Sequence, residues 1–270
     1  MSGETTAPAF DRLLDYISTE LEFESDYYNR SYLDRRVTAR MRRTDTDDYA
    51  AYRSLLEENG GEREALLDSL SINVTEFFRN PPMWEALRPV LRELTAERRT
   101  VNAWSAPSSD GREPYSLAML ALDDDEIDAD RLDVLGTDID RDALRRARRG
   151  VYHTSRTTDI AEELEPLSSY RPYVEQEADR FEVRDCVKER VTFERHDLIR
   201  GRPKSDFDLV LSRNLLIYIA TEYKREIVET VADSLRPGGY FVVGMTETLP
   251  RETKPAFEAV DKRHRVYRKR

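Results

Sequence analysis

The sequence predicts an α/β protein that begins with a small all-helical domain. Residues 10 to about 95 place apolar side chains at helical spacing and contain no convincing strand, whereas residues 100–270 alternate short apolar runs with helical segments. Strands separated by helices favour right-handed crossovers and a mostly parallel sheet covered on both faces. We therefore expect a helical domain at residues 1–95 and a Rossmann-like sheet domain at residues 96–270.

The C-terminal domain should contain six strands and four helices. The strands are expected at residues 101–104, 133–137, 191–196, 208–212, 240–244 and 263–268. The helices are expected at residues 114–122, 140–149, 222–235 and 254–260. The last strand follows a short link and no further helix follows it, which favours an antiparallel pairing at the edge of the sheet.

The turn after the first strand is the most informative motif. An apolar strand ends at Trp104, small residues follow, and a helix begins at Glu113-Pro114-Tyr115. Phosphate-binding turns of this kind carry three glycines and direct backbone N–H groups at a pyrophosphate. Here Gly111 is the only glycine, and Glu113 would repel a phosphate but attract a cation. S-adenosylmethionine, a nucleoside with a sulfonium and an amine, fits such a turn. The alternative is an ordinary helix cap followed by proline.

Acidic residues follow the second and third strands. Asp138 and Asp140 come directly after an apolar run, and Asp197 follows the next one. In nucleotide-binding α/β folds an acid at the end of the second strand accepts hydrogen bonds from ribose hydroxyls. Asp138 is therefore the predicted ribose ligand, Asp140 a helix cap and Asp197 an acceptor for an adenine amino group. Alternatively, Asp138 and Asp140 both serve only to cap the helix.

Composition narrows the range of partners. The chain has 43 basic and 54 acidic residues and a formal net charge of −11, which argues against general binding to nucleic acid or anionic membranes. A single cysteine, Cys186, excludes a disulfide within the chain and favours a reducing compartment. Because the sequence has no run of 18 apolar residues and no signal-like N-terminus, we expect a cytoplasmic protein.

Five segments, in order along the chain, resemble the chemotaxis receptor methyltransferases of the CheR family. They lie at residues 71–79, 104–116, 137–152, 213–218 and 235–244. The segment from Asn73 through Thr75 to Phe77-Phe78-Arg79 is the most diagnostic, because generic methyltransferases lack it. A buried Phe77–Phe78 pair on a helix would explain the aromatic residues but not the other matches.

The resemblance implies the class I adenosylmethionine-dependent methyltransferase fold, with a small antiparallel β insert at about residues 156–190. It implies S-adenosyl-L-methionine as cofactor and S-adenosyl-L-homocysteine as product. The implied cofactor site consists of Asn73, Thr75, Arg79, Glu113, Asp138, Asp197, Leu198, Arg213 and Asn214. The chain departs from the family at Arg112, where a second acid is usual, and at Asp197, where asparagine is usual. Neither departure removes a group that the chemistry requires.

The implied reaction is methyl transfer to a glutamate side chain of a chemotaxis receptor, giving a methyl ester. A carboxylate is already nucleophilic at neutral pH, so no general base is needed. His153, His196 and His264 need no catalytic role, and we predict no metal site. We predict that Arg79 orients the substrate carboxylate and that Tyr218 lies beside the transferred methyl group.

An arginine-rich segment is the predicted receptor-binding element. Helical spacing places Leu33, Val37 and Met41 on one face of residues 33–43. The flanking cations are Arg35, Arg36, Arg40, Arg42 and Arg43. In an acidic chain these residues form a local cationic patch, which the resemblance assigns to the acidic cytoplasmic helices of receptors. The alternative is a solvated amphipathic helix.

The sequence of the insert and the net charge argue against three further kinds of binding. Family members that dock on a pentapeptide at the receptor's C-terminus carry a Gly-x-Gly loop in the insert, but this chain has no glycine between Gly150 and Gly201. We therefore expect no pentapeptide tether, no nucleic-acid substrate and no insertion into a membrane. The alternative functions are methylation of RNA or of another protein, and a non-catalytic adapter that binds adenosylmethionine and receptors.

Overall fold

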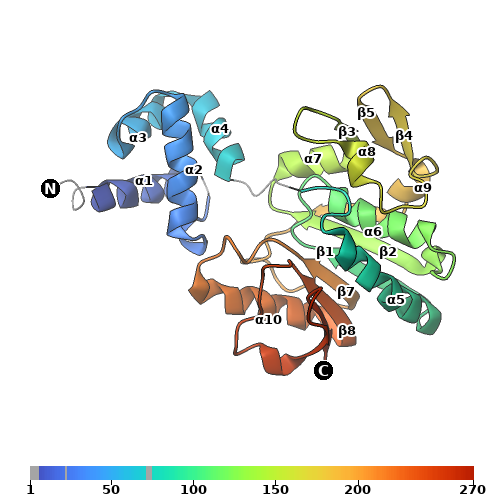
Figure 1. Cartoon of the computed structure of the whole chain (residues 1–270). Coiled ribbons are helices and arrows are strands. Elements are labelled where there is room, and N and C mark those ends of the chain that lie inside the picture. Colours follow the sequence, from blue (N-terminus) through green and yellow to red (C-terminus); the bar gives the residue numbers. More distant parts are fainter. Residues whose placement is uncertain (1–5, 22, 71–74) are drawn as a thin grey trace. The chain divides into compact units, whose positions relative to one another are not determined.

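The computed structural model describes residues 6–21, 23–70 and 75–270. The chain divides into two compact units, one formed by Met1–Ile72 with Tyr218–Lys224 and the other by Asn73–Ile217 with Arg225–Arg270 (Figure 1). The first unit is the expected helical domain with one later segment added. No helix of the described ranges is long and apolar enough to cross a membrane.

The described residues of the helical unit form four α-helices. They are α1 (Thr6–Glu20), α2 (Arg30–Arg43), α3 (Tyr49–Glu58) and α4 (Gly60–Leu70), with short 3₁₀ turns η1 (Ser25–Tyr27) and η3 (Thr221–Tyr223). The fully buried side chains of its core include Leu13, Ile17, Val37, Tyr52 and Leu66. Asp48 begins α3 because its side chain accepts a hydrogen bond from the Ala51 N–H (2.8 Å). The later segment joins this unit through an antiparallel bridge between Tyr28 and Ile219.

A seven-stranded sheet forms the centre of the second unit. Its strands are β1 (Val101–Ser105), β2 (Leu132–Asp138), β6 (Val191–Arg195), β7 (Phe207–Ser212), β8 (Leu235–Val243), β9 (Phe257–Asp261) and β10 (Val266–Lys269). They lie in the order β6-β2-β1-β7-β8-β10-β9. The first five are parallel, and β10 pairs antiparallel with both β8 and β9. The order reverses between β1 and β7, the point at which open α/β sheets bind ligands.

The second unit also contains helices, some beside this sheet and some in the insert described below. They are α5 (Pro81–Glu97), α6 (Arg112–Asp123), α7 (Arg141–Arg149), α8 (Ile160–Glu163), α9 (Asp185–Lys188) and α10 (Lys224–Ser234), with 3₁₀ turns η2 (Ala129–Arg131) and η4 (Lys254–Ala256). α6 contacts β1, β2 and β6, and α7 contacts β2 and β6. The compact unit begins at residue 73 and not near residue 96, because α5 buries Trp84, Leu87 and Leu91 in the same core as Val101 of β1.

The expected elements at the C-terminal end need correction. Residues 257–261 form strand β9 where we expected a helix, and β9, not the last strand, occupies the edge of the sheet. A tight turn explains this: the Asp261 carboxylate accepts hydrogen bonds from the Arg263 N–H (2.8 Å) and the His264 N–H (2.9 Å). The turn ends at Arg265, which has a φ of 60° and starts the return strand.

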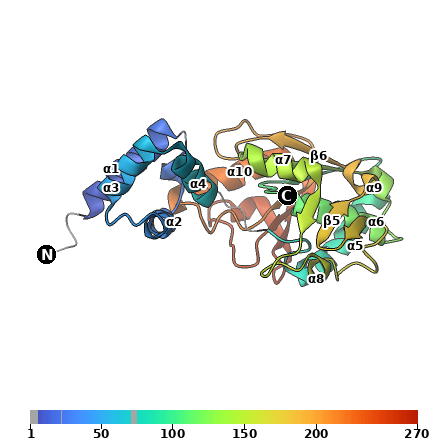
Figure 2. The ribbon, with the colours of Figure 1, turned by 90° about the horizontal axis from the view of Figure 1, so that it is seen from above.

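A second, three-stranded antiparallel sheet forms the insert. It has the order β3-β5-β4 and consists of β3 (Val151–His153), β4 (Val174–Glu177) and β5 (Arg180–Val183). It therefore starts a few residues before the expected boundary at 156. Figure 2 shows β5 and α9 beside α6, with which α9 is in contact.

Candidate functional site

The loop between β1 and α6 has a backbone that only a few residues can adopt. Gly111 has a φ of 93°, and a Cβ placed there would lie 2.8 Å from the Ala147 Cβ of α7, so glycine is required for both conformation and space. Ser109 also has a positive φ, of 49°, and its N–H donates to the Asp138 carboxylate (2.8 Å). The loop is thereby fixed against the end of β2.

Asp138 is a buried carboxylate at the carboxyl end of β2, 7% exposed. One of its oxygens accepts from the Ser109 N–H, and the other accepts from the Asp140 N–H (2.9 Å). Burial raises the pKa of Asp138 to about 6, although backbone hydrogen bonds from Asp140, Ser109 and Ile139 oppose this effect. A carboxylate has about four acceptor positions, so acceptor capacity remains for a ligand hydroxyl. Asp140 caps α7 as predicted, accepting from the Asp142 and Ala143 N–H groups.

Glu113 and Arg213 form a buried ion pair. The Arg213 Nη1 lies 3.0 Å from the Glu113 Oε2, and the Ser105 hydroxyl donates to the Glu113 Oε1 (2.9 Å). Arg213 also donates to the Arg79 carbonyl (2.7 Å) and to the Asn80 side-chain oxygen (3.0 Å). The predicted cofactor residues Arg79, Glu113 and Arg213 are therefore brought together. The sequence analysis considered Glu113 as an attractant for a cationic ligand. In the structure its charge is already paired with that of Arg213.

Three of the other predicted cofactor residues, Asp197, Leu198 and Asn214, follow strands β6 and β7. After β6, the Asp197 side chain accepts from the Ile199 N–H (2.8 Å) and the Arg200 N–H (3.1 Å), and Leu198 is buried. Asn214 follows β7 with a φ of 60°. Thr75 is half-buried. Asn73 lies outside the described residues.

Three buried serine hydroxyls at the same edge have no hydrogen-bond partner within the described part of the chain. They belong to Ser108 and Ser109 after β1 and to Ser212 at the end of β7. Buried hydroxyls are almost always hydrogen-bonded. Together with the Asp138 carboxylate, they provide the donors and acceptors that a ribose and a polar amino-acid tail require, so the residues present fit S-adenosylmethionine.

Glu247 is a residue that the sequence interpretation missed. It is 2% exposed, and its carboxylate accepts from the backbone N–H groups of Gly244 (2.6 Å), Asn214 (2.8 Å) and Ile217 (3.3 Å). Burial raises the pKa of Glu247, an effect that these hydrogen bonds oppose. Glu247 therefore fixes the turn that carries Asn214 against the end of β8. Its only sequence signal was an acid a few residues after a strand.

Tyr218 belongs to the helical unit, whereas Arg79 belongs to the sheet unit. The Tyr218 ring lies 4.8 Å from the Tyr32 ring of α2, and its carbonyl accepts from the Asn29 N–H (2.8 Å). A residue from the C-terminal half of the sequence is thus held by the N-terminal helices. Sequence spacing does not reveal such a contact.

The arginines of α2 differ in their surroundings. Arg35, Arg42 and Arg43 are exposed, and Arg36 is half-buried with its guanidinium 5.4 Å from the Tyr32 ring. Arg40 departs from the expected receptor-binding set. It donates to the Glu62 carboxylate of α4 from both Nε (3.0 Å) and Nη2 (2.5 Å), and its side chain is only 16% exposed. Arg40 therefore connects helices of the domain and is not part of a free cationic surface.

Two family descriptions match this chain. Residues 8–71 match the CheR methyltransferase all-alpha domain, and residues 73–266 match the CheR methyltransferase SAM binding domain. A chemotaxis protein methyltransferase of Vibrio parahaemolyticus is 34% identical over 193 residues, or 69% of each chain. A probable chemotaxis protein methyltransferase of Rhizobium etli is 33% identical over 237 residues, which cover 83% of this chain and 87% of the relative.

A chemotaxis protein methyltransferase of Listeria monocytogenes is 28% identical over 235 residues, which cover 86% of this chain and 87% of the relative. The two family matches together extend over both compact units. They agree with the helical domain, the α/β sheet and the buried polar edge described above. The chain therefore belongs to the CheR family of chemotaxis methyltransferases and uses S-adenosylmethionine as its cofactor.

Proposed function

We propose that this methyltransferase acts in the cytoplasm on glutamate side chains of chemotaxis receptors, giving glutamyl methyl esters and S-adenosyl-L-homocysteine. Membership of the CheR family is the observation that carries this proposal. The relatives named above are chemotaxis protein methyltransferases. No observation on the described residues favours an RNA substrate or a non-catalytic adapter.

The residues of the sheet edge have the properties that this reaction needs. When bound, S-adenosylmethionine supplies an electrophilic methyl carbon: a carboxylate oxygen forms the new bond, the carbon–sulfur bond breaks, and its electron pair stays on sulfur. No proton is transferred, so the protein has to align the two reactants and exclude water. The burial of Glu113, Asp138 and Arg213 supports such a water-poor site.

We assign the cofactor contacts as follows. Asp138 accepts the ribose hydroxyls, Asp197 and Leu198 hold the adenine, and Glu113 with Arg213 shapes the pocket for the methionine end. Asn73, Thr75 and Asn214 complete the site. Arg79 orients the substrate carboxylate, and Tyr218 lies at the transfer position. Full turnover by both Arg79→Ala and Tyr218→Phe would contradict the last two assignments.

The exposed arginines of α2 are the proposed receptor contact. Arg35, Arg42 and Arg43 are exposed, and Arg36 lies on the same helix over Tyr32. Their positive charge complements acidic receptor helices, which steers encounter and fixes register. Arg40 is left out of this surface because it pairs with Glu62.

The insert supports recognition without a receptor tail. Only Ala178 and Asp179 connect β4 to β5, so the connection is a tight turn without a glycine-bearing loop. We expect titration calorimetry with a synthetic pentapeptide from a receptor C-terminus to give no binding at tens of micromolar peptide. Micromolar affinity would contradict this expectation.

Transfer of radiolabelled methyl groups tests the reaction itself. Purified enzyme is incubated with labelled S-adenosylmethionine and receptor-containing membranes, and the product is treated with mild base. We expect volatile label released as methanol, which reports carboxyl methyl esters. Base-stable label in protein or nuclease-sensitive label in RNA would support another methyltransferase. Cofactor binding without any transfer would support the adapter.

A further inference from the structure

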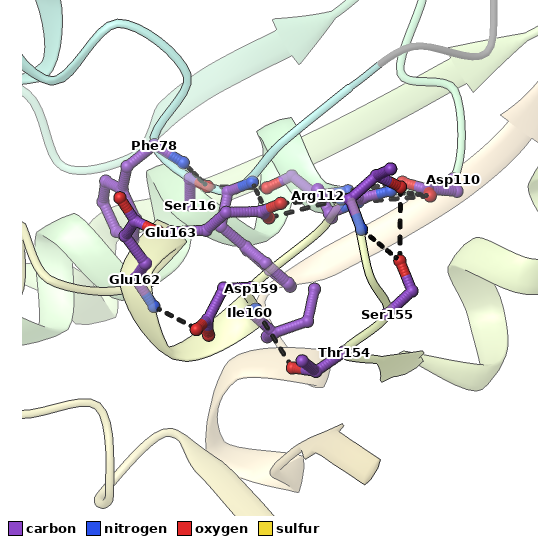
Figure 3. Close-up of polar contacts among 12 residues, drawn as sticks. Phe78, Asp110, Arg112, Ser116, Thr154, Ser155, Asp159, Ile160, Glu162 and Glu163 are labelled. Atoms are coloured by element: carbon purple, nitrogen blue, oxygen red, sulfur yellow. Dashed lines mark hydrogen bonds and ion pairs between the residues drawn. The ribbon is translucent and has the colours of Figure 1, made fainter. Parts of the chain in front are cut away.

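Arg112 lies at the centre of a largely buried charge cluster that joins the start of α6 to the end of α8 (Figure 3). Its guanidinium lies 3.0 Å from the Asp110 carboxylate through Nη2 and 3.2 Å from both Glu163 oxygens through Nη1. The side chains of all three residues are 12–15% exposed. Asp110 belongs to the loop after β1, Arg112 begins α6, and Glu163 ends α8 in the insert.

Glu163 also holds the segment that carries Arg79. Its carboxylate accepts the Phe77 N–H (2.9 Å) from a residue 86 positions earlier. The next N–H, that of Phe78, donates to the Ser116 hydroxyl of α6 (2.9 Å), and that hydroxyl donates to the Arg112 carbonyl (2.7 Å). Two consecutive backbone N–H groups before Arg79 are therefore held by this cluster.

The backbone of this segment is unusual. Phe78 has a φ of 48° and Asn80 a φ of 62°. A bulky residue rarely adopts a positive φ, and such a conformation persists only where its surroundings impose it. After Phe78 the chain continues to the Arg79 carbonyl, which accepts from Arg213 (2.7 Å) and from the Trp84 Nε1 (3.1 Å). The position of Arg79 thus depends on contacts from both sides.

The insert itself is firmly attached to this cluster. The Tyr152 hydroxyl of β3 donates to the Asp110 carbonyl (2.7 Å), and its ring packs edge-on against Phe77 with the centroids 4.9 Å apart. Asp159 caps α8 by accepting from the Ala161 N–H (3.0 Å) and the Glu162 N–H (3.3 Å). The Glu163 carboxylate is therefore presented from a fixed element.

We infer that Glu163 and Arg112 are positioning residues that impose the bent conformation of Phe77–Arg79 and so place Arg79 for methyl transfer. The inference rests on the role proposed above for Arg79. The inference gives the insert a part in catalysis, because Glu163 of the insert binds the Phe77–Arg79 segment. A carboxylate at position 112 would instead add a third negative charge beside Asp110 and Glu163.

The test compares Glu163→Leu, Glu163→Gln and Arg112→Gln with the matched control Glu162→Gln, an exposed acid on the same helix. Glu163→Leu leaves the Phe77 N–H without its acceptor and Arg112 with Asp110 as its one remaining carboxylate partner among the described residues. We expect it to lower kcat about tenfold, with the Kd for S-adenosylmethionine changed less than about threefold. Glu163→Gln keeps an acceptor oxygen and should retain more activity, while Glu162→Gln should match the wild type. Melting temperatures identify any variant that fails to fold.

A double-mutant cycle with Arg79→Ala distinguishes a role of Glu163 in positioning Arg79 from a structural role that does not involve Arg79. If Glu163 acts through Arg79, then Glu163→Leu or Glu163→Gln should cost little in the Arg79→Ala background. An equal loss of kcat in both backgrounds would overturn the inference, as would wild-type kcat for Glu163→Leu. Full activity of Arg79→Ala would remove the role on which the inference rests. A failure of the proposed function would look different, because the wild type itself would then form no base-labile esters.

Discussion

Individual carboxylates in this protein differ in function because they differ in surroundings. Asp138 is buried and accepts hydrogen bonds from backbone N–H groups, and no cation among the described residues raises or lowers its pKa. Glu113 is also buried but pairs with Arg213. Glu163 shares Arg112 with Asp110, and burial raises its pKa, an effect that the Phe77 N–H and Arg112 oppose. Residue type alone therefore does not determine which acid remains available to a ligand.

Asp138→Asn should change both the pH dependence of stability and cofactor binding. The pKa of Asp138 is about 6 in the folded state, above the 3.8 of an ordinary aspartate, so the native state holds the proton more tightly than the unfolded chain. The associated stability is present below about pH 4 and is lost as the pH rises through about 6, an effect of about 3 kcal/mol.

Asparagine does not titrate. In urea unfolding experiments between pH 4 and 7, the free energy of unfolding of Asp138→Asn should therefore fall by about 3 kcal/mol less than that of the wild type. Calorimetry should show at least about tenfold weaker binding of S-adenosylmethionine, because the amide offers fewer acceptors to the ribose. Asp140→Asn, which keeps a capping oxygen, is the control. An unchanged pH profile together with normal affinity would contradict the assignment of Asp138.

At the scale of elements, α2 combines two kinds of arginine. Val37 and Met41 face the core of the helical unit, as helical periodicity predicts. Arg40 nevertheless points to α4, where Glu62 also accepts from the Tyr52 hydroxyl of α3 (2.6 Å). The pKa of Glu62 is lowered because the bonds from Arg40 and Tyr52 outweigh the opposing effect of burial. This network joins three helices.

Arg40→Ala should therefore destabilise the protein, whereas Arg43→Ala should not. Removing one member of a largely buried ion pair costs roughly 3 kcal/mol, while an exposed arginine on the same helix is worth less than about 0.5 kcal/mol. Chemical denaturation of both variants measures the difference. Equal stability of the Arg40→Ala and Arg43→Ala variants would mean that the bond to Glu62 contributes nothing. Glu62→Gln keeps one acceptor oxygen, so its stability should lie between those of the two arginine variants.

At the scale of the whole molecule, the proposed receptor contact brings an acidic chain to an acidic partner. The net charge of −11 opposes this approach, so the proposal relies on the local positive charge of the exposed α2 arginines. Surface charge pairs are screened over about 8 Å at physiological ionic strength. Receptor recognition is therefore expected to be more sensitive to salt than cofactor binding, which takes place among buried groups.

We expect kcat/KM for receptor to fall several-fold between 50 and 500 mM salt while the Kd for S-adenosylmethionine stays nearly constant. The double variant Arg35→Glu with Arg42→Glu should lower kcat/KM at low salt and lose most of the salt dependence. Replacing exposed Arg149 of α7 by glutamate provides a control with one arginine reversed elsewhere. Equal sensitivity of this control would show a general charge effect and no defined receptor surface.

The amino-acid sequence is enough to predict the alternation of strands and helices, the helical N-terminal domain, the acid at the end of β2 and the family. These features depend on local periodicity and on short motifs. Tertiary contacts, in contrast, turn Arg40 toward Glu62 and pair Arg213 with Glu113. They also bring the Glu163 and Glu247 carboxylates to the backbone N–H groups of Phe77 and Asn214. Each of these contacts joins residues from different elements, and Glu163 reaches Phe77 across 86 positions. Residues 257–261 became a strand for the same reason, since the sheet supplies hydrogen-bonding partners that no local pattern reveals.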